Sequence, residues 1–184
     1  MFFGFVKGEA KARRQYKAIR SVLIVEDEPL VAFDNEHALE LAGYRVAATV
    51  DDYDHAVNVM EEDDVDLVIA DITLHGDKTG IDVAREAHEK GLPVLFVTGA
   101  CPSDAHEIAV GCLAKPCLPR DLVAAIAVIE ATLRGAEPPR FPMGLHLFGD
   151  LADLGGFQSW PLPFRRGWGG GERSELLSGR AERR

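Results

Sequence analysis

The fold is decided by a stretch near the start of the chain, Val22-Leu-Ile-Val-Glu-Asp-Glu-Pro29, in which four apolar residues run directly into three acids. A short run that is apolar at every position is expected of a strand buried on both faces. Pro29 suits the first turn of a helix, where its missing N–H would have no intrahelical partner. The stretch therefore predicts a buried strand, an acidic strand end and a helix that stops at Gly43.

The same unit of strand and helix recurs along the chain. Further apolar runs are followed by helical stretches, and the last helix carries an apolar stripe at helical spacing from Leu118 to Leu133. Short strands that are apolar on both faces and alternate with helices indicate a parallel sheet covered on both sides. We therefore predict a doubly wound α/β domain with five parallel strands. The four later strands are expected at 45–50, 67–70, 93–97 and 111–114.

Charge divides the chain into three parts. Residues 1–20 carry a net charge of +5 and residues 135–184 carry +1, which leaves −16 for residues 21–134 within the total of −10. We expect a basic N-terminal extension, a folded domain over 21–134 and a Gly/Pro/Arg-rich tail that is largely disordered. Within the tail, residues 141–148 are apolar enough to dock on the domain, and both outcomes stay open. So acidic a domain argues against nucleic-acid binding, which needs clustered Lys and Arg.

Apolar runs and cysteines indicate the cellular compartment of the protein. No apolar run approaches the roughly 18–20 residues that cross a bilayer, and the basic residues follow the short apolar opening, which is the wrong order for a secretory signal. We therefore expect a cytoplasmic protein. The three cysteines, Cys101, Cys112 and Cys117, have no repeated spacing and do not suggest a disulfide framework. A zinc site that includes His106 is an alternative, but the chain has no CxxC pair, so we expect the cysteines to be small residues in and beside a strand.

Polar residues follow the apolar runs at the positions where chemistry is expected. Open α/β sheets bind ligands outside the carboxyl ends of their strands. The first run ends in Glu26 and Asp27, the third in Asp71, the fourth in Thr98 and the fifth in Lys115. Parallel strands bring these side chains to one edge of the sheet. Three carboxylates, a hydroxyl and an ammonium group at one edge predict a site for Mg²⁺ and a phosphoryl group.

Each polar residue has an expected role at this edge. The acidic pair and Asp71 supply carboxylate oxygens to Mg²⁺, and Thr73 supplies a backbone carbonyl. The ion reduces repulsion between the carboxylates, so Asp71 stays ionised as the nucleophile. Lys115 pairs with the incoming phosphoryl oxygens, and Thr98 hydrogen-bonds the phosphoryl group once it is attached.

As an ordered set, four segments resemble the response-regulator receiver family of two-component signalling. The resemblance covers 21–134. It implies a sheet with the flavodoxin-like strand order 2-1-3-4-5, and it implies that Asp71 is phosphorylated by a histidine kinase or a histidine phosphotransfer protein. It also implies that the acidic pair binds Mg²⁺, that Thr98 is the hydroxyl residue that moves toward the phosphoryl group, and that Lys115 is the family's lysine, followed by a cis bond to Pro116. The segments are Val22-Leu-Ile-Val-Glu-Asp-Glu-Pro29, Asp66-Leu-Val-Ile-Ala-Asp71, Pro93-Val-Leu-Phe-Val-Thr-Gly99 and Gly111-Cys-Leu-Ala-Lys-Pro116.

The chain departs from the family pattern in three places. The family usually has an aromatic residue three positions before the lysine, and here that position is Cys112, so we do not expect output through hydroxyl–aromatic coupling. The stretch from Thr98 to Lys115 is short, with one brief helical candidate at 103–109, so the fourth helix is expected to be short or missing. Asn35 interrupts the apolar inward face of the first helix. Phe33 points the other way and is expected either to pack against the C-terminal helix or tail, or to contact a kinase partner.

These features lead to a ranked set of functions. The first is a stand-alone receiver that relays phosphoryl groups and acts through protein–protein contacts, and a receiver fold that binds partners independently of phosphorylation is the alternative. A DNA-binding regulator would need a basic helix-turn-helix module, which the tail does not supply. Phosphatases with an aspartyl-phosphate intermediate commonly have a second acid two residues after the nucleophile, where this chain has Thr73. We therefore expect slow self-dephosphorylation but no activity on a diffusible substrate, and the oligomeric state stays open.

Overall fold

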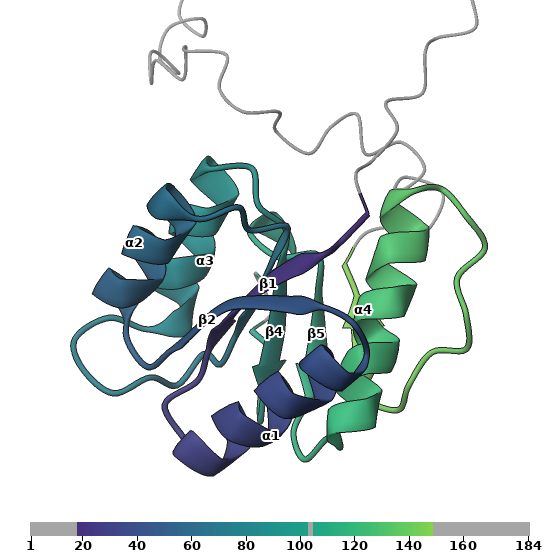
Figure 1. Ribbon diagram of the computed structural model, residues 1–184, viewed down its shortest axis with the longest axis horizontal. Helices are drawn as coiled ribbons and strands as arrows, with labels where there is room; N and C mark the ends of the chain where they lie inside the picture. The colour runs from purple at the N-terminus through teal and green to yellow at the C-terminus, as the bar shows by residue number, and fades with distance from the viewer. Residues whose placement is uncertain (1–17, 103–104, 149–184) are drawn as a thin grey trace, which may run out of the picture.

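A computed structural model describes residues 18–102 and 105–148 of the chain. These residues form one sheet with helices on both faces (Figure 1), which confirms the predicted doubly wound α/β fold. The elements in chain order are β1 (Ser21–Val25), α1 (Pro29–Leu41), β2 (Arg45–Val50), α2 (Tyr53–Glu62), β3 (Leu67–Ala70), α3 (Gly80–Glu89), β4 (Val94–Thr98), the 3₁₀ helix η1 (Ala105–Glu107), β5 (Gly111–Ala114), α4 (Pro119–Leu133) and β6 (Leu145–Leu147).

The central strands are parallel and level with one another. The sheet has the order β2-β1-β3-β4-β5-β6, which contains the predicted order 2-1-3-4-5. Every residue of β1, β3 and β4 is buried, as expected of strands that are apolar except for Ser21 at the start of β1 and Thr98 at the end of β4. Val25 pairs with Ala70, and Ala70 pairs with Phe96. The residues that follow each of these strands therefore meet at one edge of the sheet.

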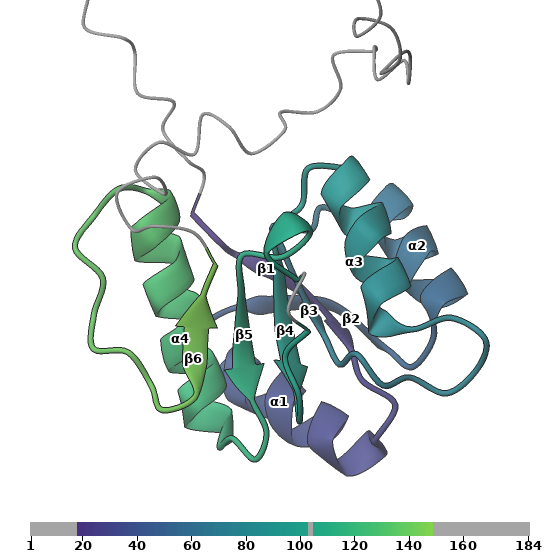
Figure 2. The ribbon, with the colours of Figure 1, turned by 180° about the vertical axis from the view of Figure 1, so that it is seen from behind.

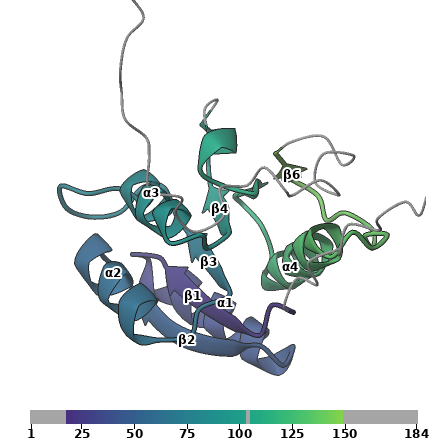
Figure 3. The same cartoon turned by 90° about the horizontal axis from the view of Figure 1, so that it is seen from above.

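Two apolar cores lie on opposite faces of the sheet. Helices α1 and α4 pack together on one face, and α2 and α3 pack together on the other (Figure 3). Successive residues of each strand pack alternately into one core and then the other. In β1, for example, Ile24 packs into the α1/α4 core and Leu23 into the α2/α3 core. This double coverage explains why the interior positions of these strands are apolar, with polar residues only at strand ends, such as Ser21 at the start of β1 and Thr98 at the end of β4.

A sixth strand extends the sheet beyond the predicted five. β6 pairs antiparallel with β5 and lies along its outer edge (Figure 2). Gly111 makes this pairing possible, because a Cβ atom there would lie 2.8 Å from the carbonyl oxygen of His146. The strand belongs to residues 135–148, which were assigned to the tail, so the docking alternative for this apolar stretch is the one that the structure shows. The N-terminal extension up to residue 17 and the rest of the tail lie outside the described residues.

The connection between β4 and β5 differs from a regular βαβ unit. Its described residues contain the three-residue helix η1 where a full helix would be usual, which confirms the expectation of a short or missing fourth helix. Cys101, in this connection, forms a disulfide with Cys112 of β5. The expectation that the cysteines do not pair was therefore wrong. The pairing depends on the loop folding back over β5, and cysteine spacing alone does not show that.

Two further observations concern the exposure of Phe33 and the length of the helices. Phe33 is 66% exposed and stacks against His37 of its own helix, so the interpretation that it packs against the C-terminal helix was wrong. Within residues 18–102 and 105–148, no helix combines the length and the apolar character needed to cross a membrane.

Candidate functional site

Three carboxylates meet at the carboxyl edge of the sheet, as the sequence predicts. Glu26 and Asp27 follow β1, and Asp71 follows β3. One oxygen from each carboxylate lies within 4.8 Å of the others, which is a spacing that one cation could bridge. Glu26 and Asp71 are buried, and the side chain of Asp27 is only 10% exposed. Water therefore screens the repulsion among these three groups poorly.

Lys115 supplies the positive charge that this cluster needs. Its Nζ donates hydrogen bonds to Glu26 Oε2 at 2.8 Å and to Asp71 Oδ2 at 2.6 Å. The peptide bond between Lys115 and Pro116 is cis, as the resemblance implied. The backbone N–H of Lys115 also donates to the carbonyl of Thr98 at 2.8 Å, so the end of β5 is fixed against the end of β4.

Burial and pairing act in opposite directions on these charges. Burial raises the pKa of Glu26 because it disfavours the carboxylate, and neighbouring Asp71 adds to the rise, while Lys115 opposes it. Burial also disfavours the charged form of Lys115, but its hydrogen bonds to Asp71 and Glu26 outweigh this effect and raise its pKa. The ammonium group thus stays charged, and Glu26 is held in surroundings that resist its ionisation.

The sequence predicted two threonines for this site, Thr98 and Thr73. Thr98 is the last residue of β4 and is buried. Because Ala70 pairs with Phe96, Thr98 ends the strand next to the one that Asp71 follows. Thr73 is exposed on the loop after β3, and its backbone N–H donates to Asp71 Oδ1 at 3.2 Å. Both residues are therefore on the predicted edge, and their roles toward a phosphoryl group and a cation remain proposals.

Sequence reasoning missed two residues at this site. Gly80 begins α3 so close to β3 that a Cβ atom there would lie 1.8 Å from the backbone oxygen of Asp71. His75 lies on the same loop as Thr73, and its Nδ1 makes direct contact with Asp27 Oδ2. The available signal for His75 was its place on a loop already predicted to supply a metal ligand. For Gly80 the only signal was a glycine where a helix begins.

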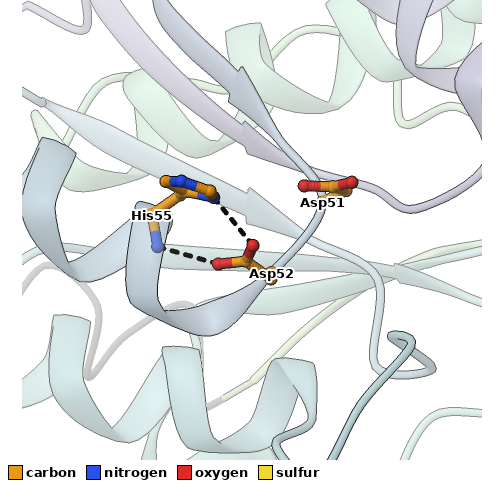
Figure 4. Close-up of side chains that lie close together, drawn as sticks. All are labelled: Asp51, Asp52 and His55. Carbon is orange, nitrogen blue, oxygen red and sulfur yellow. Dashed lines mark hydrogen bonds and ion pairs between the residues drawn. The ribbon is translucent and has the colours of Figure 1, made fainter.

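A second group of polar side chains lies after β2. Figure 4 shows Asp51, Asp52 and His55, whose ligand atoms also lie within 4.8 Å of one another. Asp52 caps α2, because its carboxylate accepts the backbone N–H of His55 at 2.8 Å and contacts the His55 ring at 2.7 Å. These bonds lower the pKa of Asp52, the backbone bond most of all. The helix start explains this group, and Asp51 and His55 are exposed to solvent.

The donor set at the carboxyl edge fits a magnesium ion. Mg²⁺ prefers oxygen ligands and is usually bound through one or two carboxylates together with water. Glu26, Asp27 and Asp71 provide such oxygens, and burial of two of them strengthens their attraction to a cation. A doubly wound sheet with acids and a lysine at its carboxyl edge has the architecture of a signalling receiver domain.

The family comparison agrees with this architecture. A family model described as the response regulator receiver domain matches residues 22–127, so the chain belongs to the response regulator receiver domain family. Members generally use Mg²⁺ at an acidic pocket, and a receiver domain implies a histidine kinase or phosphotransfer protein as its partner.

Known proteins match most of the described region. The chain is 33% identical over 121 residues to the transcriptional regulatory protein PdtaR of Mycobacterium tuberculosis, an alignment that covers 62% of this chain and 58% of PdtaR. It resembles the crystal structure of a LuxR-family two-component response regulator from Aurantimonas, with a TM-score of 0.57 and 29% identity over 66% of this chain and 91% of that one. It also resembles a CheY-like receiver domain from Methanospirillum hungatei, with a TM-score of 0.54 and 26% identity over 59% of this chain and 91% of that one.

Proposed function

We propose that this receiver accepts a phosphoryl group on Asp71 from a histidine kinase or a histidine phosphotransfer protein, in a Mg²⁺-dependent reaction. The supporting observation is the buried Asp71 carboxylate, which is bonded to Lys115 and lies within cation-bridging distance of Glu26 and Asp27. Domain 21–134 carries this function, extended by β6 along its edge.

The reaction is a transfer between two side chains. An oxygen of Asp71 attacks phosphorus, the bond from phosphorus to the donor's imidazole nitrogen breaks, and that nitrogen keeps the electron pair. Mg²⁺ supplies neutralising charge when bound. Lys115 exchanges its bond to Asp71 for one to the new phosphoryl oxygens, and Thr98 donates its hydroxyl to the same group. The resulting state is favoured because two groups from adjacent strand ends close on one phosphoryl group.

The partner is proposed to dock beside this edge of the sheet. Exposed apolar side chains lie along α1 at Leu30, Phe33 and Leu41, which share one face at helical spacing. Leu118, three residues after Lys115, is also exposed. Helix α1 begins just after the acidic pair, so a partner on this face would lie close to Asp71. Such a partner is a helical protein that presents a phosphorylated histidine.

The working location and the activity are part of the proposal. We place the protein in the cytoplasm. Output passes through protein contacts, and hydrolysis of its own aspartyl phosphate is the only turnover expected. Binding of partners without phosphorylation is the alternative function.

Phosphorylation by a small-molecule donor tests the proposal directly. The full chain is incubated with acetyl phosphate with and without Mg²⁺, and incorporated phosphate is measured by intact mass. We expect one Mg²⁺-dependent phosphate in the wild type and none in Asp71→Asn. Asp52→Asn is the matched control, because asparagine also caps helices and Asp52 lies outside the site, so it should be labelled normally. Absence of label in the wild type with both acetyl phosphate and a phosphorylated histidine donor would favour the binding-module alternative.

A further inference from the structure

We propose that Cys101 and Cys112 form a reversible redox pair, and that their disulfide holds the segment after Thr98 against β5 and so hinders phosphorylation of Asp71. The inference rests on the proposed function, because it concerns the regulation of the same site. The observation behind it is the disulfide that joins the connection between β4 and β5 to β5 itself, with the two Cα atoms 6.3 Å apart. This separation lies within the range of about 4.4–6.8 Å that disulfides usually span.

The disulfide lies near Thr98 in the chain and on the same face of the sheet. Phe96 pairs with Cys112, and Thr98 pairs with Ala114. The chain that leaves β4 at Thr98 therefore turns back, so that Cys101 joins β5 two residues before the partner of Thr98. Phe96 and Cys112 both belong to the α2/α3 core. Because side chains alternate along a strand, the side chain of Thr98 points to this face as well.

The disulfide anchors the residues around Thr98 at two points. Strand pairing at Phe96 holds one end of this segment, and the covalent bond at Cys101 holds the other. In the same structure Lys115 is bonded to Asp71, which is the arrangement from which the proposed transfer begins. A bond that fits this arrangement and restrains Thr98 favours the unphosphorylated state over the state in which Thr98 bonds the phosphoryl group.

The two cysteines differ in their access to an oxidant. Cys101 is exposed to solvent, whereas Cys112 is fully buried in β5. A peroxide such as hydrogen peroxide therefore meets Cys101 first. The Cys101 thiolate attacks one peroxide oxygen, the O–O bond breaks, hydroxide leaves and a sulfenic acid forms. The sulfur of Cys112 then displaces a second hydroxide from that sulfenic acid, and the two hydroxides take up the two thiol protons to give two water molecules.

A small thiol such as glutathione reverses the bond by exchange. A glutathione thiolate attacks the exposed Cys101, the disulfide bond breaks, and Cys112 leaves as a thiolate that takes up a proton. A second glutathione thiolate attacks the glutathione sulfur, which frees Cys101 and gives glutathione disulfide. Cys112 is held in β5 by pairing with Phe96 on one side and with His146 on the other. The pair can therefore close again when an oxidant returns.

Cys117 provides a matched control on the same molecule. It is a free and partly buried thiol. Burial raises the pKa of this thiol, so less of it is present as the reactive thiolate. Cys101→Ser changes an exposed side chain by one atom and is expected to fold. Cys117→Ser makes the same change outside the pair, so only Cys101→Ser should remove the redox response.

Phosphorylation of the full chain in its two redox states tests the proposal. The chain is reduced with dithiothreitol or oxidised with hydrogen peroxide, freed of reagent, and incubated with acetyl phosphate and Mg²⁺, and peptide mass mapping shows whether Cys101 and Cys112 are joined. The steady-state ratio of phosphorylated to unphosphorylated chain should be at least about fivefold lower in the oxidised form, the smallest effect typical of coupled sites. Dithiothreitol should restore it. Cys101→Ser should give the same ratio before and after peroxide, and Cys117→Ser should respond as the wild type does.

The outcomes separate this proposal from the proposed function. A wild-type chain in which peroxide forms no bond between Cys101 and Cys112 would overturn the proposal, as would a bond that leaves the phosphorylated ratio unchanged or raises it. An equal loss of phosphate in Cys101→Ser after peroxide would also overturn it, because another oxidised side chain would then be responsible. If the reduced wild type takes up no phosphate, the proposed function fails and the regulation fails with it, whether or not the bond forms.

Discussion

Two lysines in the described part of the chain each bridge a pair of carboxylates, and one of these bridges belongs to the site. Lys115 Nζ lies 2.8 Å from Glu26 and 2.6 Å from Asp71. Lys90 Nζ lies 3.2 Å from both Glu61 and Glu86. The two lysine side chains are similarly exposed, at 21% and 26%. Their acids differ, because Glu26 and Asp71 are 3% and 9% exposed, whereas Glu61 and Glu86 are 57% and 28% exposed.

The two lysines make similar contacts, but burial of the acids gives the Lys115 bridge different electrostatic consequences from the Lys90 bridge. Hydrogen bonds to Glu86 and Glu61 raise the pKa of Lys90, but water screens this bridge, and exposed ion pairs contribute at most about 1 kcal/mol. At Lys115 the desolvated acids depend on the ammonium group for compensation, and burial still raises the pKa of Glu26. In the buried bridge, burial still disfavours the ionised form of Glu26, and a bound cation or a phosphoryl group can change this balance of charge. The exposed bridge of Lys90 is screened by water, so its charges cannot respond to a cation in the same way.

The largest expected difference between the bridges is in stability. Lys115→Met should lower the free energy of unfolding by about 3 kcal/mol without divalent cations, because it leaves two buried carboxylates uncompensated. Lys90→Met should lower it by less than about 1 kcal/mol. Urea unfolding in the presence of a chelator measures both values. Equal losses for the two variants would show that burial does not distinguish the bridges.

Magnesium provides the next sharpest distinction. A cation that binds only the folded chain should stabilise it by about 2.7 kcal/mol when its concentration is a hundred times its dissociation constant. The gain should persist in Lys90→Met, because the exposed bridge takes no part in it. It should be strongly reduced in Asp27→Asn, which keeps the Lys115 bridge but removes one charge from the cluster. A gain of full size in Asp27→Asn would place the ion elsewhere, and thermal unfolding at several Mg²⁺ concentrations measures it.

The parts of the site that the sequence predicts are those set by strand geometry. Glu26, Asp71 and Lys115 each follow an unbroken apolar run, and level parallel strands must bring their ends together. The order of the five parallel strands was predicted from the family resemblance, because an alternation of strands and helices does not fix it. What could not be predicted is the direct bond from Lys115 to both acids, because it depends on side-chain conformation rather than on strand position.

The features that were missed depend on tertiary contacts. The strand β6 has three residues and no periodicity of its own, and it exists because Gly111 lets its backbone approach β5. The Cys101–Cys112 disulfide needs a loop to fold back across β5. Likewise, His75 reaches Asp27 only because its loop returns to the end of β1. A sequence pattern shows how apolar and polar residues alternate within an element. It does not show which strand an irregular loop folds back to contact.

The smallest expected effect concerns the charge on Glu26 and depends on pH. Because its folded pKa is raised above 4.5, ionised Glu26 costs stability at neutral pH, and its favourable contribution is complete only below the unfolded pKa. Glu26→Gln should therefore be more stable than the wild type at pH 7 without divalent cations, by less than the Lys115→Met loss. This advantage should shrink as the pH falls through the folded pKa of Glu26 toward 4.5, because the wild-type carboxyl then gains its proton. Urea unfolding from pH 7 to pH 4 measures the difference, with Glu61→Gln of the exposed bridge as the control that should show no comparable advantage at pH 7. A Glu26→Gln variant that is less stable than the wild type at pH 7 would show that the attraction of Lys115 outweighs the effect of burial at this carboxylate. The Lys115 and Lys90 bridges would then both be stabilising and would differ only in the size of that stabilisation.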